Sequence, residues 1–452
     1  MSLNVALNTA LSGLFANQRA VAATSENIAN VNTPDFARRE AQFFTDAIPN
    51  QFSGVDVEIA RAATDRFLQS AVFQGAADAA GAEVIADALA RIEASLGAPG
   101  DNISFSNALD DAFASLTSLS ANPSSIAARA DAIAALDAAF AAFARTQDAI
   151  ALESDAALSQ LSASADRVNA LLEEVFRLNA TAPDSPGAAD LINARLTELS
   201  SFIDIAVTRA DDGRVTVSTQ SGTLLANSAS FAAIGVEAGP PTSVTVASVD
   251  GASGVAGAAA PAAAGDIGAG TLRGLLDLRN TTLTALADDV QATAQGVADS
   301  LNAAYAQNSI VGATAPTTDA LIVADAAGRF SVNAVLRDDP ARLAIARPSA
   351  GNAGGANDGL GAAALADIGV SPATAAAAET VARIGSAARN AQLAAETNSA
   401  LATELSTRAS AESGVNLDEE LSNLIVFQRA YNANARVIAA VDELWQSLLS
   451  LI

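Results

Sequence analysis

The sequence contains no cysteine, no histidine and no lysine, so each of its 24 basic residues is an arginine. Without cysteine and histidine there can be no disulfide, thiol nucleophile, zinc–thiolate cluster or imidazole-based catalytic triad. The absence of lysine excludes a Ser–Lys dyad as well. Four acidic doublets lack the spacing of a calcium-binding loop and are typical of turns and exposed helix positions: Asp110-Asp111, Asp211-Asp212, Asp288-Asp289 and Asp338-Asp339. We therefore predict that the chain is not an enzyme and holds no cofactor and no metal.

Positive charge is also scarce, because 50 acidic residues give a net charge of −26. A negative surface argues against nucleic-acid binding and against anionic membrane surfaces, since both attract basic proteins. Asp, Ser and Thr interrupt the alanine-rich stretches before these reach the ~20 apolar residues that span a bilayer, so we expect no membrane insertion. The first basic residue is Arg19, and no charged segment precedes an apolar one. We therefore expect no cleavable signal peptide.

Apolar residues recur at helical spacing at both ends of the chain. The first stripe ends where Asn30 and Pro34 break a helix, and the last one begins after Gly414, with Asn416 as its N-cap and Glu419 three residues on. Polar residues, among them Gln18 and Gln428, interrupt both stripes. The stripes consist of Leu3, Leu7, Ala10, Leu14, Val21 and Ile28, and of Leu417, Leu421, Leu424, Tyr431, Ala435, Ile438, Trp445, Leu449 and Ile452. The second stripe extends over about five heptads, which indicates a coiled coil.

Between the ends, the pattern changes from helix to strand and back. Apolar residues from Ile133 to Val175 fit one helix of about 45 residues, which is typical of a rod-like bundle. Alternating residues from Ile203 onwards predict strands, and further strands are expected at Leu321–Val323 and Phe330–Val332. A helical period returns from Val381 onwards.

The fold class that we predict is mainly α with a β insertion, in a multi-domain chain. The terminal helices form a coiled coil, the interior helices form a helical-bundle rod domain, and the β-rich domain lies outside. The predicted division is 1–60 with 411–452 for the terminal coiled coil and its connecting segment, 61–203 with 271–410 for the rod, and 204–270 for the β-rich insertion.

The terminal stripes allow two interpretations. Narrow apolar stripes bury little surface against the ~1–2 kcal/mol per residue that ordering a backbone costs. One interpretation is that both ends are loosely ordered in the monomer and become helical when neighbouring copies cover them. The other is an ordinary intramolecular helical hairpin.

Two motifs resemble a known family. The run NIANVNTPDFAR, from Asn27 to Arg38, resembles the N-terminal signature of flagellar rod, hook and hook-associated proteins, with Asp35 in place of the usual Gly and Phe36 in place of Tyr. The run SGVNLDEE, from Ser413 to Glu420, is similar to the bacterial flagellar hook-associated protein 1 family in particular. The resemblance extends over nearly the whole chain and is weakest over 230–270 and 311–370.

This resemblance implies a structural subunit of the bacterial flagellum, at the hook–filament junction. It implies self-assembly into a ring, with flagellar hook protein, hook-associated protein 3 and a cytoplasmic export chaperone as partners. It also implies an extracellular place in the flagellum and type III export without a cleavable signal peptide. The expected assembly interface is Leu3, Leu7, Leu14, Ile28, Leu417, Leu421, Leu424, Phe427, Tyr431, Ile438, Trp445 and Leu449. The axial-protein motif residues, expected to fix a bend after the first helix, are Asn27, Asn30, Thr33, Pro34, Phe36 and Arg38.

Two alternatives stay open at this point. One is another flagellar axial protein, either hook or distal rod, which would share the N-terminal motif but usually lacks SGVNLDEE. The other is a secreted coiled-coil binding module, which would need a cluster of aromatic or polar residues on the β segment.

Overall fold

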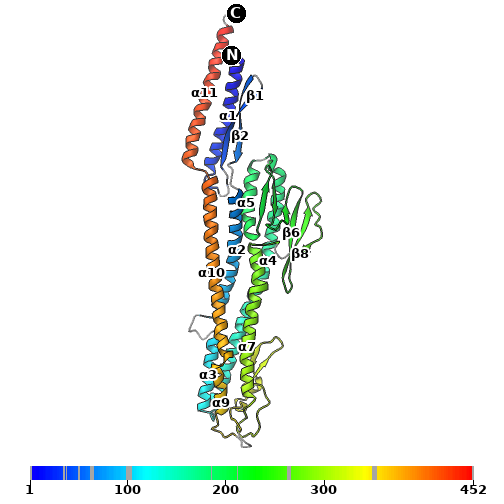
Figure 1. The fold of residues 1–452 in the computed structure, drawn as a ribbon, viewed down its shortest axis with the longest axis vertical. Coiled ribbons are helices and arrows are strands. Elements are labelled where there is room, and N and C mark those ends of the chain that lie inside the picture. Colours follow the sequence, from blue (N-terminus) through cyan, green and yellow to red (C-terminus); the bar gives the residue numbers. More distant parts are fainter. Residues whose placement is uncertain are drawn as a thin grey trace.

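The chain folds into an elongated molecule whose two ends lie at the same tip (Figure 1). The computed structural model describes residues 3–33, 36, 38–48, 51–61, 66–97, 104–184, 186–210, 212–261, 266–348 and 354–449. Long helices run along the molecule, and a β-sheet lies beside them near the middle. The predicted class, mainly α with a β insertion and paired terminal helices, is confirmed.

The tip contains the first and last helices together with a β-hairpin. Helix α1 (Leu3–Ala29) packs antiparallel against α11 (Leu417–Leu449), as the close approach of residues 13 and 434 and of residues 27 and 420 shows. Strands β1 (Arg39–Ile48) and β2 (Gln51–Arg61) form a two-stranded antiparallel hairpin that packs on α1. The sequence predicts only a connecting segment at this place, so the hairpin is an addition to the expected fold.

The rod consists of long helices that pack on small side chains. Helix α4 (Ile126–Thr181) has 56 residues, longer than the 45 expected, and begins at Ser125, whose Oγ accepts from Ala128 N at 3.1 Å. A Cβ on Gly274 would lie 2.5 Å from the backbone oxygen of Gly81, so two helices touch there through their backbones. The other rod helices are α2 (Arg66–Ser95), α3 (Phe105–Ala121), α5 (Pro186–Phe202), α6 (Thr271–Asp277), α7 (Thr284–Tyr305), α8 (Ala334–Asp338), α9 (Leu360–Ala366) and α10 (Pro372–Ser413).

The insertion is a six-stranded antiparallel sheet in sequential order, β3-β4-β5-β6-β7-β8. Two asparagines of α4 bind its backbone: Asn169 bonds to both N and O of Ile234, and Asn179 to both N and O of Val215, at 2.6–2.9 Å. The sheet is therefore fixed to the rod along α4. Its strands are β3 (Ala206–Arg209), β4 (Val215–Ser218), β5 (Leu224–Ala226), β6 (Ser230–Glu237), β7 (Ser243–Asp250) and β8 (Ala260–Pro261).

A π-helical segment provides a second anchor for the sheet. Between α6 and α7, η2 (Leu278–Leu283) directs Asn280 towards Thr242, which precedes β7. Asn280 Nδ2 donates to Thr242 O at 2.8 Å, and its Oδ1 accepts from Thr242 N at 2.9 Å. A π-turn adds one residue to a helix and so redirects its side chains. Here that change in direction brings the amide to the sheet.

Asp204 lies at the neck where the chain enters and leaves the sheet. Its side chain is buried, and Oδ1 accepts from Gly268 N at 2.8 Å. Burial raises the pKa of Asp204 above its usual value, although backbone N–H donors, with Gly268 first, oppose this shift. The carboxylate thus joins the two ends of the insertion.

We expect Asp204→Ala to lower the free energy of unfolding by about 1 kcal/mol, because the Gly268 N–H loses its acceptor. Asp204→Asn keeps one acceptor oxygen and should lose less. Since the folded-state pKa is raised, the contribution of Asp204 is present at low pH and is lost as pH rises from about 4 through the folded pKa. Urea titrations of both variants at several pH values check this. Parallel pH profiles for wild type and Asp204→Asn would contradict it.

The far end of the rod contains the last short elements. The predicted strands near residues 321 and 330 are confirmed as β9 (Ile322–Ala324) and β10 (Phe330–Val332), which pair antiparallel. The 3-10 turns of the described chain are η1 (Ala182–Asp184), η3 (Pro340–Arg342) and η4 (Asp367–Val370).

One helical stretch, Leu360–Ser447, is apolar enough to cross a membrane by length and composition alone, with a mean hydropathy of 1.3 over its test window. Asp, Ser and Thr still interrupt this stretch, for example at Asp367, Ser371 and Thr374, and the expectation of no membrane insertion stays a prediction. The stretch is not one continuous helix, since η4 and Gly414 divide it.

Candidate functional site: the paired terminal helices

The contact between α1 and α11 is built mainly on small residues. The buried residues of α1 are Ala10, Gly13, Ala16, Asn17, Ala20, Ala23, Thr24 and Asn27. A Cβ on Gly13 would lie 2.9 Å from Asn434 Nδ2, so the glycine allows the two helices to approach closely. Asn17 Nδ2 donates to Gly13 O at 2.6 Å and so has a partner within α1. Leu3, Leu7, Leu14 and Ile28 lie half-buried at the edges of this contact.

The two sequence motifs meet at a buried polar cluster, which we call the terminal node: Asn27, Arg38, Glu419 and Glu420. Asn27 is fully buried, and its Nδ2 donates to Glu420 Oε2 at 2.9 Å and to the backbone oxygen of residue 39 at 2.8 Å. Arg38 donates through Nε to Glu420 Oε1 at 2.7 Å and through Nη2 to Glu419 Oε1 at 2.8 Å. The node therefore joins α1, the start of the hairpin and α11.

Arg38 and Glu420 form the buried ion pair of the node. Glu420 is 2% exposed, and the Arg38 side chain is 17% exposed. Burial lowers the pKa of Arg38, but hydrogen bonds to Glu419 and Glu420 outweigh that effect and raise the pKa above its usual value. Arg38 is therefore charged at any physiological pH. A buried ion pair with satisfied hydrogen bonds tolerates loss of either partner poorly.

A tight turn follows α1. Asn30 Nδ2 donates to Glu26 O at 2.9 Å, Thr33 N donates to Asn30 O at 2.8 Å, and Thr33 Oγ1 lies 3.2 Å from Asn30 Oδ1. Phe36 lies beneath Arg39, whose guanidinium carbon is 5.8 Å from the ring centroid. Pro34 lies outside the described residues.

Arg39 links the tip to the rod. Its Nη2 donates to Asp190 Oδ2 of α5 at 3.3 Å, and its Nη1 pairs with Glu26 of α1. The main chain of Arg39 also donates to Asn27 Oδ1 at 2.9 Å. One residue thus connects α1, the hairpin and the rod, which the sequence analysis did not foresee.

Asn416 caps α11, as predicted. Its Oδ1 accepts from Asp418 N at 3.1 Å and from Glu419 N at 3.4 Å. Three acidic residues in the first turn, at positions 418–420, also complement the helix dipole. The Glu419 carboxylate accepts from Arg38 Nη2, whereas in a capping box it would accept from the backbone N–H of the cap residue.

Large apolar side chains of the tip are left open to solvent. Of the expected interface on α11, Leu424, Phe427 and Ile438 are half-buried, whereas Leu417, Leu421, Tyr431 and Trp445 are 36–43% exposed. The side chain of Leu449 lies outside the described residues. Phe15, Ile425, Val426 and Leu444 are 49–59% exposed. A stable monomer rarely exposes so many large apolar groups together, and such patches mark interaction sites.

The comparisons with known proteins agree with these motifs. The model of the flagellar hook-associated protein FlgK helical domain matches residues 89–314, half of the 452 residues. The chain belongs to the FlgK family. Two further models match its ends: the flagella basal body rod protein at 7–36, and the C-terminal region of the flagellar basal body rod FlgEFG proteins at 408–451.

The fold agrees with a solved FlgK structure, whereas no curated protein sequence matches the chain significantly. The flagellar hook junction protein FlgK from Burkholderia pseudomallei aligns with a TM-score of 0.50 and 20% identity. The alignment covers 58% of this FlgK-family chain and 47% of that protein, so the chain matches about half of its length. At this identity the likeness shows the fold alone.

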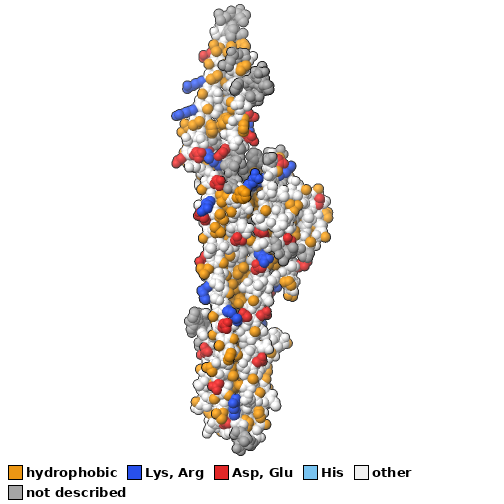
Figure 2. All heavy atoms as spheres, in the orientation of Figure 1, with side chains coloured by type: hydrophobic (Ala, Val, Ile, Leu, Met, Phe, Trp, Pro, Cys, Tyr) orange, Lys and Arg blue, Asp and Glu red, His pale blue; other side chains and the backbone are white. Residues whose placement is uncertain are grey.

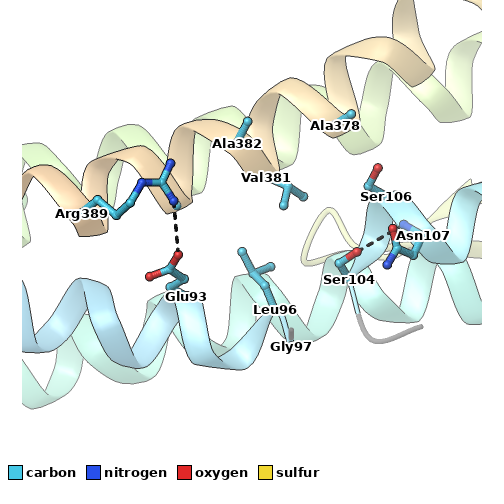
Figure 3. Close-up of a pocket in the computed structure, with 11 residues that line it drawn as sticks. Glu93, Leu96, Gly97, Ser104, Ser106, Asn107, Ala378, Val381, Ala382 and Arg389 are labelled. Atoms are coloured by element: carbon cyan, nitrogen blue, oxygen red, sulfur yellow. Dashed lines mark hydrogen bonds and ion pairs between the residues drawn. The ribbon is translucent and has the colours of Figure 1, made fainter. Parts of the chain in front are cut away.

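Among the residues that the structure describes, two hollows of this FlgK-family chain bear on the question of function. One of about 360 Å³ lies between α1 and α11, lined by Gln18, Val21, Gln428, Tyr431 and Asn432. Gln18 and Gln428, two of the polar residues that interrupt the stripes, thus lie at the same hollow. The other, of about 390 Å³, lies between α2, α3 and α10 (Figure 3).

The rod hollow offers little chemistry. Glu93 faces Arg389 across it at 3.9 Å, and Leu96 and Val381 point towards each other beside them (Figure 3). Ser104 Oγ is engaged as the N-cap of α3, accepting from Asn107 N at 3.2 Å. One ion-paired carboxylate cannot supply a paired acid and base. Within the described part of the chain, no group of three or more acidic, His or Cys residues could hold a metal.

Proposed function

We propose that this chain is a non-enzymatic structural subunit at the junction between flagellar hook and filament, and that it assembles into a ring through its terminal helices. The observation that supports this most is the terminal node, where the axial-protein motif and SGVNLDEE bind each other through Asn27, Arg38 and Glu420. The exposed apolar side chains of α1 and α11 supply the surface that neighbouring copies would bury.

The proposal includes the division into domains and the partners. Residues 1–60 with 411–452 form the assembly region, 61–203 with 271–410 the rod, and 204–270 the outward β-rich insertion. Hook protein, hook-associated protein 3 and an export chaperone are the proposed partners, and the extracellular flagellum is the proposed place. A chaperone would shield the apolar face of α11 before export by a helix-in-groove contact.

Deletion of the gene tests the function directly. We expect hooks without filaments in electron micrographs, and restored filaments when the wild-type chain is supplied. Filaments that form normally without the chain would refute a junction role.

A substitution on α11 tests the assembly surface. We expect Leu424→Asp to reduce the fraction of filamented cells at least tenfold, because a carboxylate would be buried between helices. The melting temperature should change little, since the rod contains most of the core. Ser399→Asp, at an exposed position of α10, is the matched control and should leave filaments intact. Normal filament growth with Leu424→Asp would show that the surface is misassigned.

A further inference from the structure

Helix α11 has a second apolar stripe that its own chain does not cover. Steps of four and three residues connect its members, and these members are largely exposed; Val426 is 56%, Val437 45% and Leu444 55% exposed. We call this the outer stripe: Val426, Ala430, Ala433, Val437, Ala440 and Leu444. Its alanines have smaller side chains than the valines and the leucine beside them, and a bulky group of a partner can pack on such small residues.

Two arginines flank the outer stripe. Arg429 and Arg436 are both exposed, and each lies three or four residues from a stripe alanine, hence beside it on the helix surface. Seven residues separate them, which corresponds to about 10.5 Å along the axis. Neither guanidinium has an ion pair with a carboxylate of the described residues. They are the basic residues of α11, and Figure 2 shows basic side chains at that edge of the tip.

The outer face of the β-hairpin is the complement of this surface. Phe44 pairs with Asp56 and Gln42 with Glu58, so these four side chains share one face of the hairpin. Phe44 is 49% exposed, and Asp56 and Glu58 are exposed beside it. Asp56 has an ion pair with Arg19 at 3.8 Å, but both side chains are more than half exposed, and such pairs are weak. The face is one aromatic ring flanked by two carboxylates.

The two complementary surfaces cannot meet within one chain. The opposite face of the hairpin packs inwards: Val57 is 2% exposed, and the Phe43 ring lies 5.8 Å from that of Phe427 on α11. Phe44, Asp56 and Glu58 therefore point away from their own α11. A second copy of this chain can present its outer stripe to them.

We infer that the outer hairpin face of one copy docks on the outer stripe of the next, an inference that rests on the proposed function. Phe44 packs on Ala430 and Ala433, while Asp56 and Glu58 pair with Arg429 and Arg436. Different surfaces of two identical chains meet in this contact. Such a head-to-tail contact repeats and builds a closed ring or a helical array.

A disulfide cross-link between two introduced cysteines tests the contact. The chain has no cysteine of its own, so no other disulfide can form within or between its copies. A chain with Phe44→Cys and Ala433→Cys is expressed in the deletion strain, and isolated hooks with filaments are treated with a mild oxidant. We expect dimers and higher multimers on denaturing gels, because a disulfide requires Cβ atoms within about 4.5 Å. The matched control combines Phe44→Cys with Ala439→Cys, an exposed alanine on another face of α11, and should give none.

Charge reversal provides a second measurement. Arg429→Glu with Arg436→Glu, and separately Asp56→Arg with Glu58→Arg, should each lower the fraction of filamented cells at least tenfold. All four changes together should restore at least half of the filaments. If the specific cross-link does not form, or if neither charge reversal affects the filaments, the proposed contact is wrong. The junction role is still supported in that case, provided that the wild-type chain restores filaments in the deletion strain. Failure of the wild-type chain to restore filaments would instead overturn the junction role itself.

Discussion

Replacement of Glu420 by alanine is expected to release both ends of the chain from their present contacts. The substitution removes the acceptor of Arg38 Nε and of Asn27 Nδ2, and it leaves a guanidinium in a site where its side chain is 17% exposed. Loss of one partner of a buried pair costs about 3–5 kcal/mol, and we expect the lower end of this range because Glu419 still accepts from Arg38. Because the node lies at the tip, the substitution should destabilise α1, α11 and the hairpin. The rod has its own hydrophobic core and should stay folded.

Hydrogen exchange measures this effect locally. A local loss of about 3 kcal/mol corresponds to exchange that is roughly 100-fold faster in α1 and α11. The amides of α4 should exchange as in the wild type and serve as an internal reference. In cells, filaments should be absent, because the tip no longer presents its assembly surface.

A neighbouring carboxylate gives the matched control. Glu419 also accepts from Arg38, but its side chain is 53% exposed, so Glu419→Ala should cost about 0–1 kcal/mol. Glu420→Gln keeps an oxygen for Asn27 and loses the charge, and should lie between the two. If the amides of α1 and α11 exchange at the same rate in Glu420→Ala and Glu419→Ala, the buried position of Glu420 does not increase its contribution. The terminal node would then not hold α1 and α11 together.

The sequence was informative where local signals decide the structure. The breakers Gly414 and Asn416 placed the boundary between α10 and α11, whereas the apolar patterns from Ile133 and from Val381 begin seven and nine residues inside α4 and α10. Both terminal motifs can be read from the sequence, and Asn30 and Thr33 of the first motif take part in the turn after α1. The family assignment followed from those same short runs.

Contacts between distant residues could not be predicted in this way. Asn27 and Glu420 are 393 positions apart, and nothing local marks them as partners. The contact between α1 and α11 was expected on leucines, but its buried residues on α1 are mostly alanine and glycine, because close approach requires small side chains. The hairpin did leave a signal, since Val55, Val57 and Ile59 alternate, and a search for strands before residue 66 would have found it.

In dilute monomer, α1 and α11 are expected to exchange their amides far faster than the rod does. Burying an alanine methyl group contributes on the order of 0.8 kcal/mol, whereas ordering each backbone residue costs about 1–2 kcal/mol. α1 has 27 residues, and most of those it buries are Ala or Gly, so its contact with α11 cannot offset that cost by a wide margin. Large groups that could add more, such as Phe15, Leu421 and Ile425, are 43–59% exposed in the single chain.

Assembly should slow the amide exchange of α1 and α11 towards that of the rod. Neighbouring copies would bury the exposed apolar side chains, and this adds stability that depends on chain concentration. Limited proteolysis of the dilute monomer should cut between α1 and β1 and near Gly414, and should leave the rod and its sheet intact. The same sites should resist cleavage in isolated hooks that carry filaments. The rod helix α4, within the same molecule, controls for protease access and for global unfolding. Equal protection of α1 and α4 in the dilute monomer would mean that the helical hairpin is stable by itself and that the ends do not depend on adjoining copies for their order.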